Sequence, residues 1–308
     1  MPKSKAKPSG TATTLRHWLT NAALQVVIGA IKLLPYHARV PALGWVMRRV
    51  IGPVAQYRRR ALQQLDYIWP DRDAGERRAI ADAALDNVGR TFAENYSGPA
   101  FRARQAGLPL SGPGADQVLA ALNAGEPVLF AAAHYGNYEA LRARLLPHGI
   151  TVGAMYRTAS NPYFDRHYRA MLEEWQGPIY NSDARGTARF ARDLKQGQAQ
   201  AIMFDLYVAG APPLPFLGQP APSSVAAARM ATKAGALLVP FYAVRQANGL
   251  DFEVTIEAPI AHSTIEDMTR ALNASLEAQI RQEPGQWIWA HRRWKPGRKL
   301  RRNHVQRL

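Results

Sequence analysis

Residues 128–139 read VLFAAAHYGNYE, and this stretch decides the fold. The run Val128–Ala133 contains no polar residue, which predicts a strand buried on both faces. Gly136 and Asn137 then offer a turn and a helix N-cap. The periodic segment Tyr138–Leu146 predicts a helix after the turn. Residues 128–146 therefore predict a strand, a tight turn and a helix.

His134 falls at the tip of this predicted strand, and Glu139 falls in the first turn of the predicted helix. Ligands of α/β sheets bind at strand ends of this kind. A helix N-terminus favours an ionised carboxylate, so we expect Glu139 to hold the imidazole in one tautomer. The two residues are then a proton-abstracting pair. The alternative is that both are solvated residues at a helix end, because this spacing is common by chance.

The chain beyond Gly125 alternates between strand and helix patterns, whereas the first third is helical. This alternation predicts an α/β fold with a mixed, mostly parallel sheet flanked by helices. The predicted strands are Val128–Ala133, Thr151–Tyr156, Ala199–Phe204, Ala236–Val244 and Phe252–Glu257. The predicted helices are Ala79–Ala93, Tyr138–Leu146, Pro162–Trp175, Gly186–Lys195, Ser223–Lys233 and Thr264–Gln282.

The composition is that of a globular protein with a strongly basic surface. Hydrophobic residues make up 47% of the 308 residues, which suffices for a core. The chain has no cysteine, which excludes thiol nucleophiles, disulfides and thiolate zinc sites. Its net charge of +16 favours polyanionic partners, among them nucleic acid, anionic membranes, acidic carrier proteins and phosphorylated lipids.

The N-terminal region combines basic and apolar segments. Residues 1–14 are small, polar and basic, and we expect them to be disordered. Residues 15–60 hold two apolar stretches, Leu15–Leu34 and Val40–Val54, with arginines and tryptophan among them. They predict a membrane-associating helical segment, which either spans the bilayer or lies on it; the alternative is a buried helical hairpin. Residues 61–298 form the predicted catalytic domain, and 299–308 a basic tail.

Several familiar site motifs are absent from the sequence. It has no G-x-x-x-x-G-K-[ST] loop, no G-x-G-x-x-G fingerprint, no G-x-S-x-G elbow and no H-E-x-x-H pair. We therefore expect no bound cofactor and no catalytic metal. No nucleic-acid-binding motif with stacking aromatic residues is present either, so no nucleic-acid partner is expected.

The His134-x4-Glu139 box resembles that of the lysophospholipid acyltransferase superfamily, and the ordered segments that follow resemble the lipid A late (lauroyl/myristoyl) acyltransferases. Those segments are YR at 156–157, NPYFDR at 161–166, FD at 204–205, PFLGQPA at 215–221, AGALLVP at 234–240 and QWIWAHRRWK at 286–295. Together they span nearly the whole chain. One departure is Leu206, where the family often has glutamine after the aspartate.

The resemblance implies a function and roles for four residues. The enzyme would move a fatty acyl chain from acyl carrier protein thioester to a hydroxyl of a lipid A precursor, without a covalent intermediate. His134 would be the general base and Glu139 its orienting partner. Arg157 would bind acceptor phosphate or the oxyanion, and Asp205 would be a second substrate-binding residue or a cap on the next turn. The site would face the cytoplasm at the inner membrane.

Two alternatives remain at this point. The first is an acyltransferase of the same fold that acts on another glycolipid, phospholipid or aminolipid, because relatives with other acceptors share these motifs. The second is a basic protein without enzymatic activity that binds a membrane surface or nucleic acid. Its support is the net charge and the arginine-rich tail.

Overall fold

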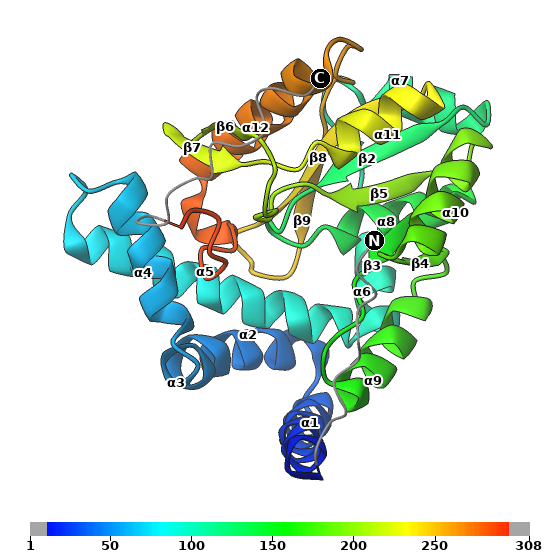
Figure 1. The fold of residues 1–308 in the computed structure, drawn as a ribbon. Helices are drawn as coiled ribbons and strands as arrows, with labels where there is room; N and C mark the ends of the chain where they lie inside the picture. The colour runs from blue at the N-terminus through cyan, green and yellow to red at the C-terminus, as the bar shows by residue number, and fades with distance from the viewer. Residues whose placement is uncertain (1–10, 296–308) are drawn as a thin grey trace.

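A computed structural model describes residues 11–295. The predicted basic tail at 299–308 lies outside these residues, as does most of the predicted disordered segment at 1–14. The described chain is an α/β fold whose central sheet has strand order β1-β9-β8-β2-β5-β3-β4 (Figure 1). All neighbouring strands run parallel except β8 and β9. The predicted fold class is confirmed.

The strands are β1 (Leu110–Ser111), β2 (Val128–Ala132), β3 (Gly153–Tyr156), β4 (Ile179–Asn181), β5 (Gln200–Met203), β6 (Pro213–Phe216), β7 (Gln219–Pro222), β8 (Leu237–Arg245) and β9 (Phe252–Ile256). The five predicted strands correspond to β2, β3, β5, β8 and β9. Sequence patterns missed the other four. Two of these, β6 and β7, form a separate antiparallel hairpin beside the main sheet.

The helices are α1 (Thr11–Lys32), α2 (Tyr36–Val46), α3 (Gly52–Val54), α4 (Tyr57–Ile68), α5 (Ala74–Asn95), α6 (Gly98–Gln105), α7 (Ala115–Asn123), α8 (Glu139–Leu145), α9 (Pro162–Glu173), α10 (Ala184–Lys195), α11 (Ala226–Ala234) and α12 (Ile265–Gln282). Short helical turns cover Met47–Ile51, Leu146–His148 and Pro284–Gln286. Local chemistry explains the predicted starts: the side chain of Asn161 accepts hydrogen bonds from two N–H groups of α9, and Thr264 caps α12.

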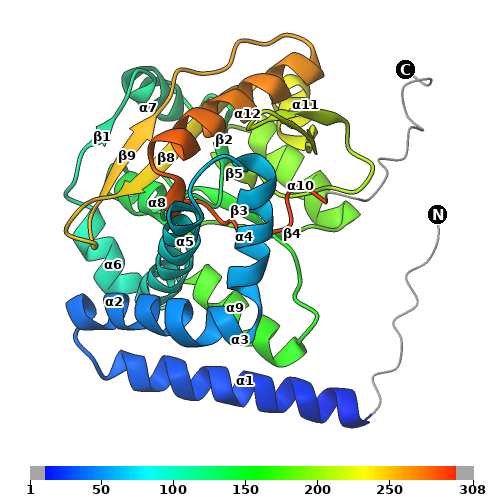
Figure 2. The same cartoon turned by 90° about the vertical axis from the view of Figure 1, so that its left-hand side faces the viewer.

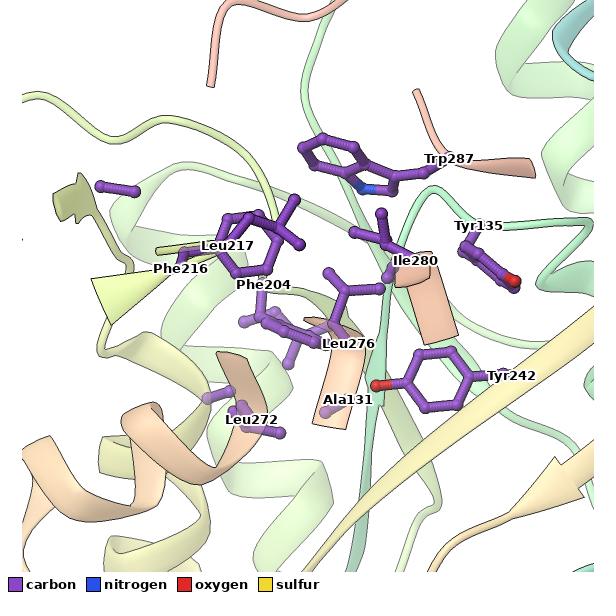
Figure 3. Close-up of a cluster of buried hydrophobic side chains, with 14 of the residues drawn as sticks. Ala131, Tyr135, Phe204, Phe216, Leu217, Tyr242, Leu272, Leu276, Ile280 and Trp287 are labelled. Atoms are coloured by element: carbon purple, nitrogen blue, oxygen red, sulfur yellow. The ribbon is translucent and has the colours of Figure 1, made fainter. Parts of the chain in front are cut away.

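Two apolar cores lie on opposite faces of the sheet, and β2 contributes to both. Leu129 and Ala131 point into the core shared with α10, α11 and α12, whereas Val128 and Phe130 pack with α7, α8 and α9. Every residue of β2 is buried, which explains why this strand is apolar throughout. Figure 3 shows the α12 side of this packing, where Leu272 and neighbouring side chains of α12 meet the aromatic rings near the end of the sheet.

Helix α1 runs along one side of the molecule, beneath α2 and α3 in the view of Figure 2. It contacts α2 and α9, and the side chain of Asn161 donates a hydrogen bond to the carbonyl of His17 at 2.9 Å. In the described residues, no helix has both the length and the apolar character needed to cross a bilayer.

The turn after β2 predicts a difference between two glycine substitutions. Gly136 has φ +57°, and a Cβ placed there would lie 1.7 Å from the Ala243 carbonyl oxygen. Gly235 has a similar φ of +64° with no atom within 4 Å of such a Cβ. We expect Gly235→Ala to cost about 1 kcal/mol of unfolding free energy, from backbone strain alone. Gly136→Ala should cost roughly 3 kcal/mol or more, because backbone must also move. Urea denaturation of both variants tests this; equal losses would contradict it.

Candidate functional site

The turn Tyr135–Asn137 leads the chain from β2 into α8, and His134 comes directly before it. The carbonyl oxygen of Gly136 accepts hydrogen bonds from Thr91 Oγ1 at 3.0 Å and Asn87 Nδ2 at 3.3 Å, both on α5. Its N–H donates to the carbonyl of Gln286 at 3.0 Å. The turn is thus fixed to α5 on one side and to the C-terminal segment on the other.

Asn137 is fully buried in this turn and connects it to an ion pair. Its amide nitrogen donates to Glu94 at 2.9 Å, and its side-chain oxygen accepts the N–H of Glu139 at 3.1 Å. Glu94 has no exposed surface and pairs with Arg245 of β8, whose Nη2 lies 2.9 Å from the carboxylate. Asn137 therefore joins α5, β8 and the start of α8, whereas the N-cap position predicted for it is held by Tyr138.

Asp205 is the carboxylate that orients His134. Its Oδ1 accepts from His134 Nδ1 at 2.9 Å, and its Oδ2 accepts from the His134 backbone N–H at 2.9 Å. The indole of Trp287 also donates to Oδ2, at 3.0 Å. In the parallel pair β2–β5, Ala132 is in register with Met203, so His134 and Asp205 follow at matching positions two residues later. The site therefore joins the ends of two adjacent strands.

The hydrogen bonds define which nitrogen of the imidazole can act as a base. Ionised carboxylates only accept, so His134 Nδ1 must carry a proton, and in the neutral imidazole the lone pair is therefore on Nε2. Burial lowers the pKa of His134, but the charge and hydrogen bond of Asp205 outweigh it, and the pKa is raised overall. Burial raises the pKa of Asp205, yet His134 and Trp287 bring it below its usual value. The imidazole keeps 25% of its side-chain surface exposed.

A cavity of about 160 Å³ opens beside His134, between the sheet and helices α8 and α9. Its sheet side is almost wholly apolar, and its helix side carries several polar groups. The lining residues on the sheet side are Ala132, Val152, Ala154, Met155, Tyr156, Ile179, Ala201, Met203 and Phe241. Those on the helix side are Tyr138, Glu139, Leu141, Arg142, Tyr168 and Leu172. The site therefore places an imidazole at a largely apolar pocket.

Contrary to the expectation, Glu139 does not hydrogen-bond the imidazole of His134. Its carboxylate accepts a hydrogen bond from Arg142 one turn along α8 at 3.0 Å, and both side chains are buried. The reason is geometric: in a helix, residues three apart share a face, so the carboxylate of Glu139 meets Arg142. Glu139 and His134 line the same cavity, but Asp205 holds the ring. The expected orienting role of Glu139 is thus corrected.

Of the other two candidate residues, one is buried and one is exposed. Asp205, expected to contact substrate, is 1% exposed and has its oxygens on His134 and Trp287. Arg157 follows β3 directly after the cavity residue Tyr156 and is exposed. Arg293, in the C-terminal segment, is fully buried and donates to Ser223 at 2.8 Å.

Sequence reasoning missed the part that the C-terminal tryptophans take in the site. Trp287 packs against Phe216 and Trp289, as an apolar core residue does. Its Nε1 nevertheless hydrogen-bonds Asp205. The apolar alternation of this segment cannot reveal this bond. A buried indole N–H usually has an acceptor, and pairing it with the carboxylate at a buried strand end could have revealed the bond. Among residues 11–295, no three histidine, aspartate or glutamate side chains lie together as metal ligands would.

Comparison with known protein families matches residues 5–296 to the family described as bacterial lipid A biosynthesis acyltransferase. The match covers nearly the whole chain, so it includes all the site residues from His134 to Trp287. No curated protein matches the chain.

The His134–Asp205 pair predicts a stability difference that depends on pH. A histidine whose pKa is raised in the folded state contributes its full stabilisation below the pKa of the unfolded chain, and this contribution is lost as pH rises through the folded-state pKa. An aspartate whose pKa is lowered contributes its full stabilisation above the unfolded pKa, and this contribution is lost as pH falls through the folded-state pKa. The pair should therefore contribute most between about pH 4 and pH 6.5. We expect the unfolding free energy lost in Asp205→Asn to be larger at about pH 5 than at about pH 9, measured by urea denaturation. A loss that grows with pH would contradict this.

Proposed function

This chain belongs to the bacterial lipid A biosynthesis acyltransferase family and is an acyltransferase; on that premise, we propose that His134 and Asp205 are its general base and orienting carboxylate. The proposed reaction moves a fatty acyl chain from a thioester to a hydroxyl of a lipid A precursor. The observation that carries this proposal is the 2.9 Å bond from His134 Nδ1 to Asp205, at a histidine that lines the cavity. In the neutral ring this bond leaves the lone pair on Nε2 of a histidine that lines a largely apolar pocket.

The chemistry then needs no covalent enzyme intermediate, because a thioester is already activated. His134 Nε2 takes the proton of the acceptor hydroxyl while its oxygen attacks the thioester carbonyl carbon. The new C–O ester bond forms, the C–S bond breaks, and the imidazolium returns the proton to the departing thiolate. Asp205 stabilises the imidazolium between these steps, as a buried carboxylate does in other histidine bases. The apolar sheet wall of the cavity receives the acyl chain.

For the donor, we propose acyl carrier protein, as the family resemblance implies. It is an acidic partner, and the chain carries a net charge of +16, which favours such an encounter. Arg157 is proposed to meet the acceptor phosphate or the oxyanion, because it is exposed at a strand end next to the cavity. Its guanidinium suits either group.

We further propose that the N-terminal helices hold the enzyme at the cytoplasmic face of the inner membrane. Among the described residues, nearly all exposed large hydrophobic side chains fall between residues 15 and 54: Leu15, Trp18, Leu19, Val26, Leu33, Leu34, Trp45, Val50 and Val54. No acidic residue occurs in the sequence before Asp66. Apolar side chains among cations suit insertion into an anionic lipid surface.

Acyl transfer by the purified protein tests the proposed base. His134→Ala should lower kcat by about 10²–10⁴-fold, because general-base assistance is lost. Asp205→Asn should also lower kcat strongly, since an asparagine can hold the ring in the wrong tautomer. Arg169→Gln, which breaks an exposed ion pair on α9, is the matched control and should keep wild-type rates.

A panel of carrier-protein thioesters with candidate acceptors gives the measurement, and mass spectrometry of lipids from a deletion strain gives the cellular readout. A His134→Ala variant as fast as wild type would refute the base. Unchanged lipid A acylation in the deletion strain would favour another lipid acceptor.

Vesicle binding tests the membrane proposal. The double change Trp18→Asp and Leu33→Asp should sharply reduce co-sedimentation with vesicles that contain anionic lipid, because exposed apolar anchors become charged. Val208→Asp alters an exposed apolar side chain outside the N-terminal helices and should bind as wild type does. If all three proteins sediment equally, these helices do not anchor the enzyme.

A further inference from the structure

The chain that follows Asp205 is bound to the C-terminal segment through its backbone. The N–H of Tyr207 donates to Nε2 of His291 at 3.0 Å. Among residues 11–295, no other backbone N–H from 206 to 210 has a hydrogen-bond partner. Residues 208–210 are exposed. His291 therefore anchors the backbone between the site carboxylate and an exposed loop.

The same tyrosine is also held by its ring. Lys295 Nζ lies 3.5 Å from the ring centroid of Tyr207, which is a cation–π contact. The segment that provides both contacts is itself fixed: the N–H of Arg293 donates to the His291 carbonyl at 2.9 Å, and the buried guanidinium of Arg293 donates to Ser223 at 2.8 Å. Two side chains of one anchored segment thus hold Tyr207, one by its backbone and one by its ring.

The imidazole of His291 is neutral at neutral pH, and its contact with Tyr207 requires this. A nitrogen that accepts a hydrogen bond must hold a lone pair, so the neutral ring carries its proton on Nδ1. Burial lowers the pKa of His291 to about 4. The charge of Asp205 opposes this shift, whereas those of His134, Arg293 and Lys295 add to it. Nε2 is therefore able to accept the backbone N–H wherever the imidazole of the base is active.

The anchored backbone leads directly to the carboxylate that orients the base. Asp205 lies two residues before the N–H that His291 accepts. On the strand side, the N–H of Phe204 donates to the Ala132 carbonyl at 3.1 Å. Asp205 thus lies between two backbone anchors. Its two bonds to His134, each 2.9 Å long, depend on this support, because hydrogen bonds weaken steeply when donor and acceptor move out of line.

We infer that His291 is a positioning residue: it accepts the Tyr207 N–H and so holds the Asp205 carboxylate against His134. The inference rests on the proposed function, since it concerns the same base. His291 is not among the described residues that line the cavity, so it acts through Asp205 and not on the substrate. Burial lowers the pKa of His134 and Asp205 raises it, so a looser contact between the two leaves that pKa lower.

Three variants of the full-length protein test this, with the pKa of His134 followed by NMR titration without substrate and kcat measured separately. His291→Leu removes the acceptor; it should lower the pKa of His134 and lower kcat roughly tenfold or more, since small displacements of a catalytic group are costly. His291→Gln keeps an acceptor oxygen and should restore both values toward wild type. The matched control is His262→Leu, which should change neither. The His262 imidazole also hydrogen-bonds a backbone group, the Ala236 carbonyl at 2.9 Å, but before β8, at the sheet edge opposite to His134.

An unchanged pKa of His134 in folded His291→Leu overturns the inference even if kcat falls, because a loss of stability alone does not move that pKa. A His291→Gln variant that behaves like His291→Leu overturns it as well. If His291→Leu does not fold, the wild-type protein decides. A neutral His291 with its proton on Nδ1 and slow exchange of the Tyr207 amide support the inference, whereas a proton on Nε2 or fast exchange overturns it.

The titration also separates this inference from the proposed reaction, because it needs no substrate. A wild-type protein that transfers no acyl chain refutes the reaction. If the pKa of His134 still falls in His291→Leu, the positioning of the His134–Asp205 pair by His291 stands.

Discussion

The buried carboxylate of Asp205 is the interaction on which the site depends. An ionised carboxylate without partners is very costly inside a protein. Here the backbone N–H and Nδ1 of His134 and the indole of Trp287 all donate to it. The donors come from the end of β2 and from the C-terminal segment, which are far apart in sequence. Satisfying this one charge therefore fixes the strand ends, the imidazole tautomer and the C-terminal chain together.

A second buried charge supports the same turn from the opposite side. Glu94 on α5 and Arg245 on β8 are an ion pair with almost no exposed surface, and Asn137 of the turn donates to Glu94. Removing one member of such a pair is strongly destabilising, since the other charge stays buried alone. The Gly136 backbone also leaves no room for a side chain, because a Cβ there would meet the Ala243 carbonyl oxygen of β8. The position of His134 is thus a property of the whole fold rather than of its own strand.

Much of this could be predicted from sequence, because local patterns carry it. The apolar run of β2 and the Asn161-Pro162 start of α9 follow from burial and capping, which involve near neighbours only. The short strands β1 and β4 and the proline-rich hairpin β6–β7 have no such signal. The partner of His134 was misassigned for a related reason: Glu139 is near in sequence, whereas Asp205 is near only through the register of β2 and β5.

That register nevertheless has a sequence signature. Two apolar strands are each followed by one polar residue, His134 and Asp205, and these residues lie side by side when the strands are parallel neighbours in the register observed here. Glu139, by contrast, begins a helix whose own periodicity provides Arg142 as a partner. Glu139, the carboxylate nearest to His134 in sequence, is thus bound to Arg142 on the cavity wall. Asp205, the carboxylate nearest to it in the sheet, orients the base. A five-residue spacing across a strand-to-helix turn therefore indicates a shared cavity, while contact with the imidazole is decided by strand order.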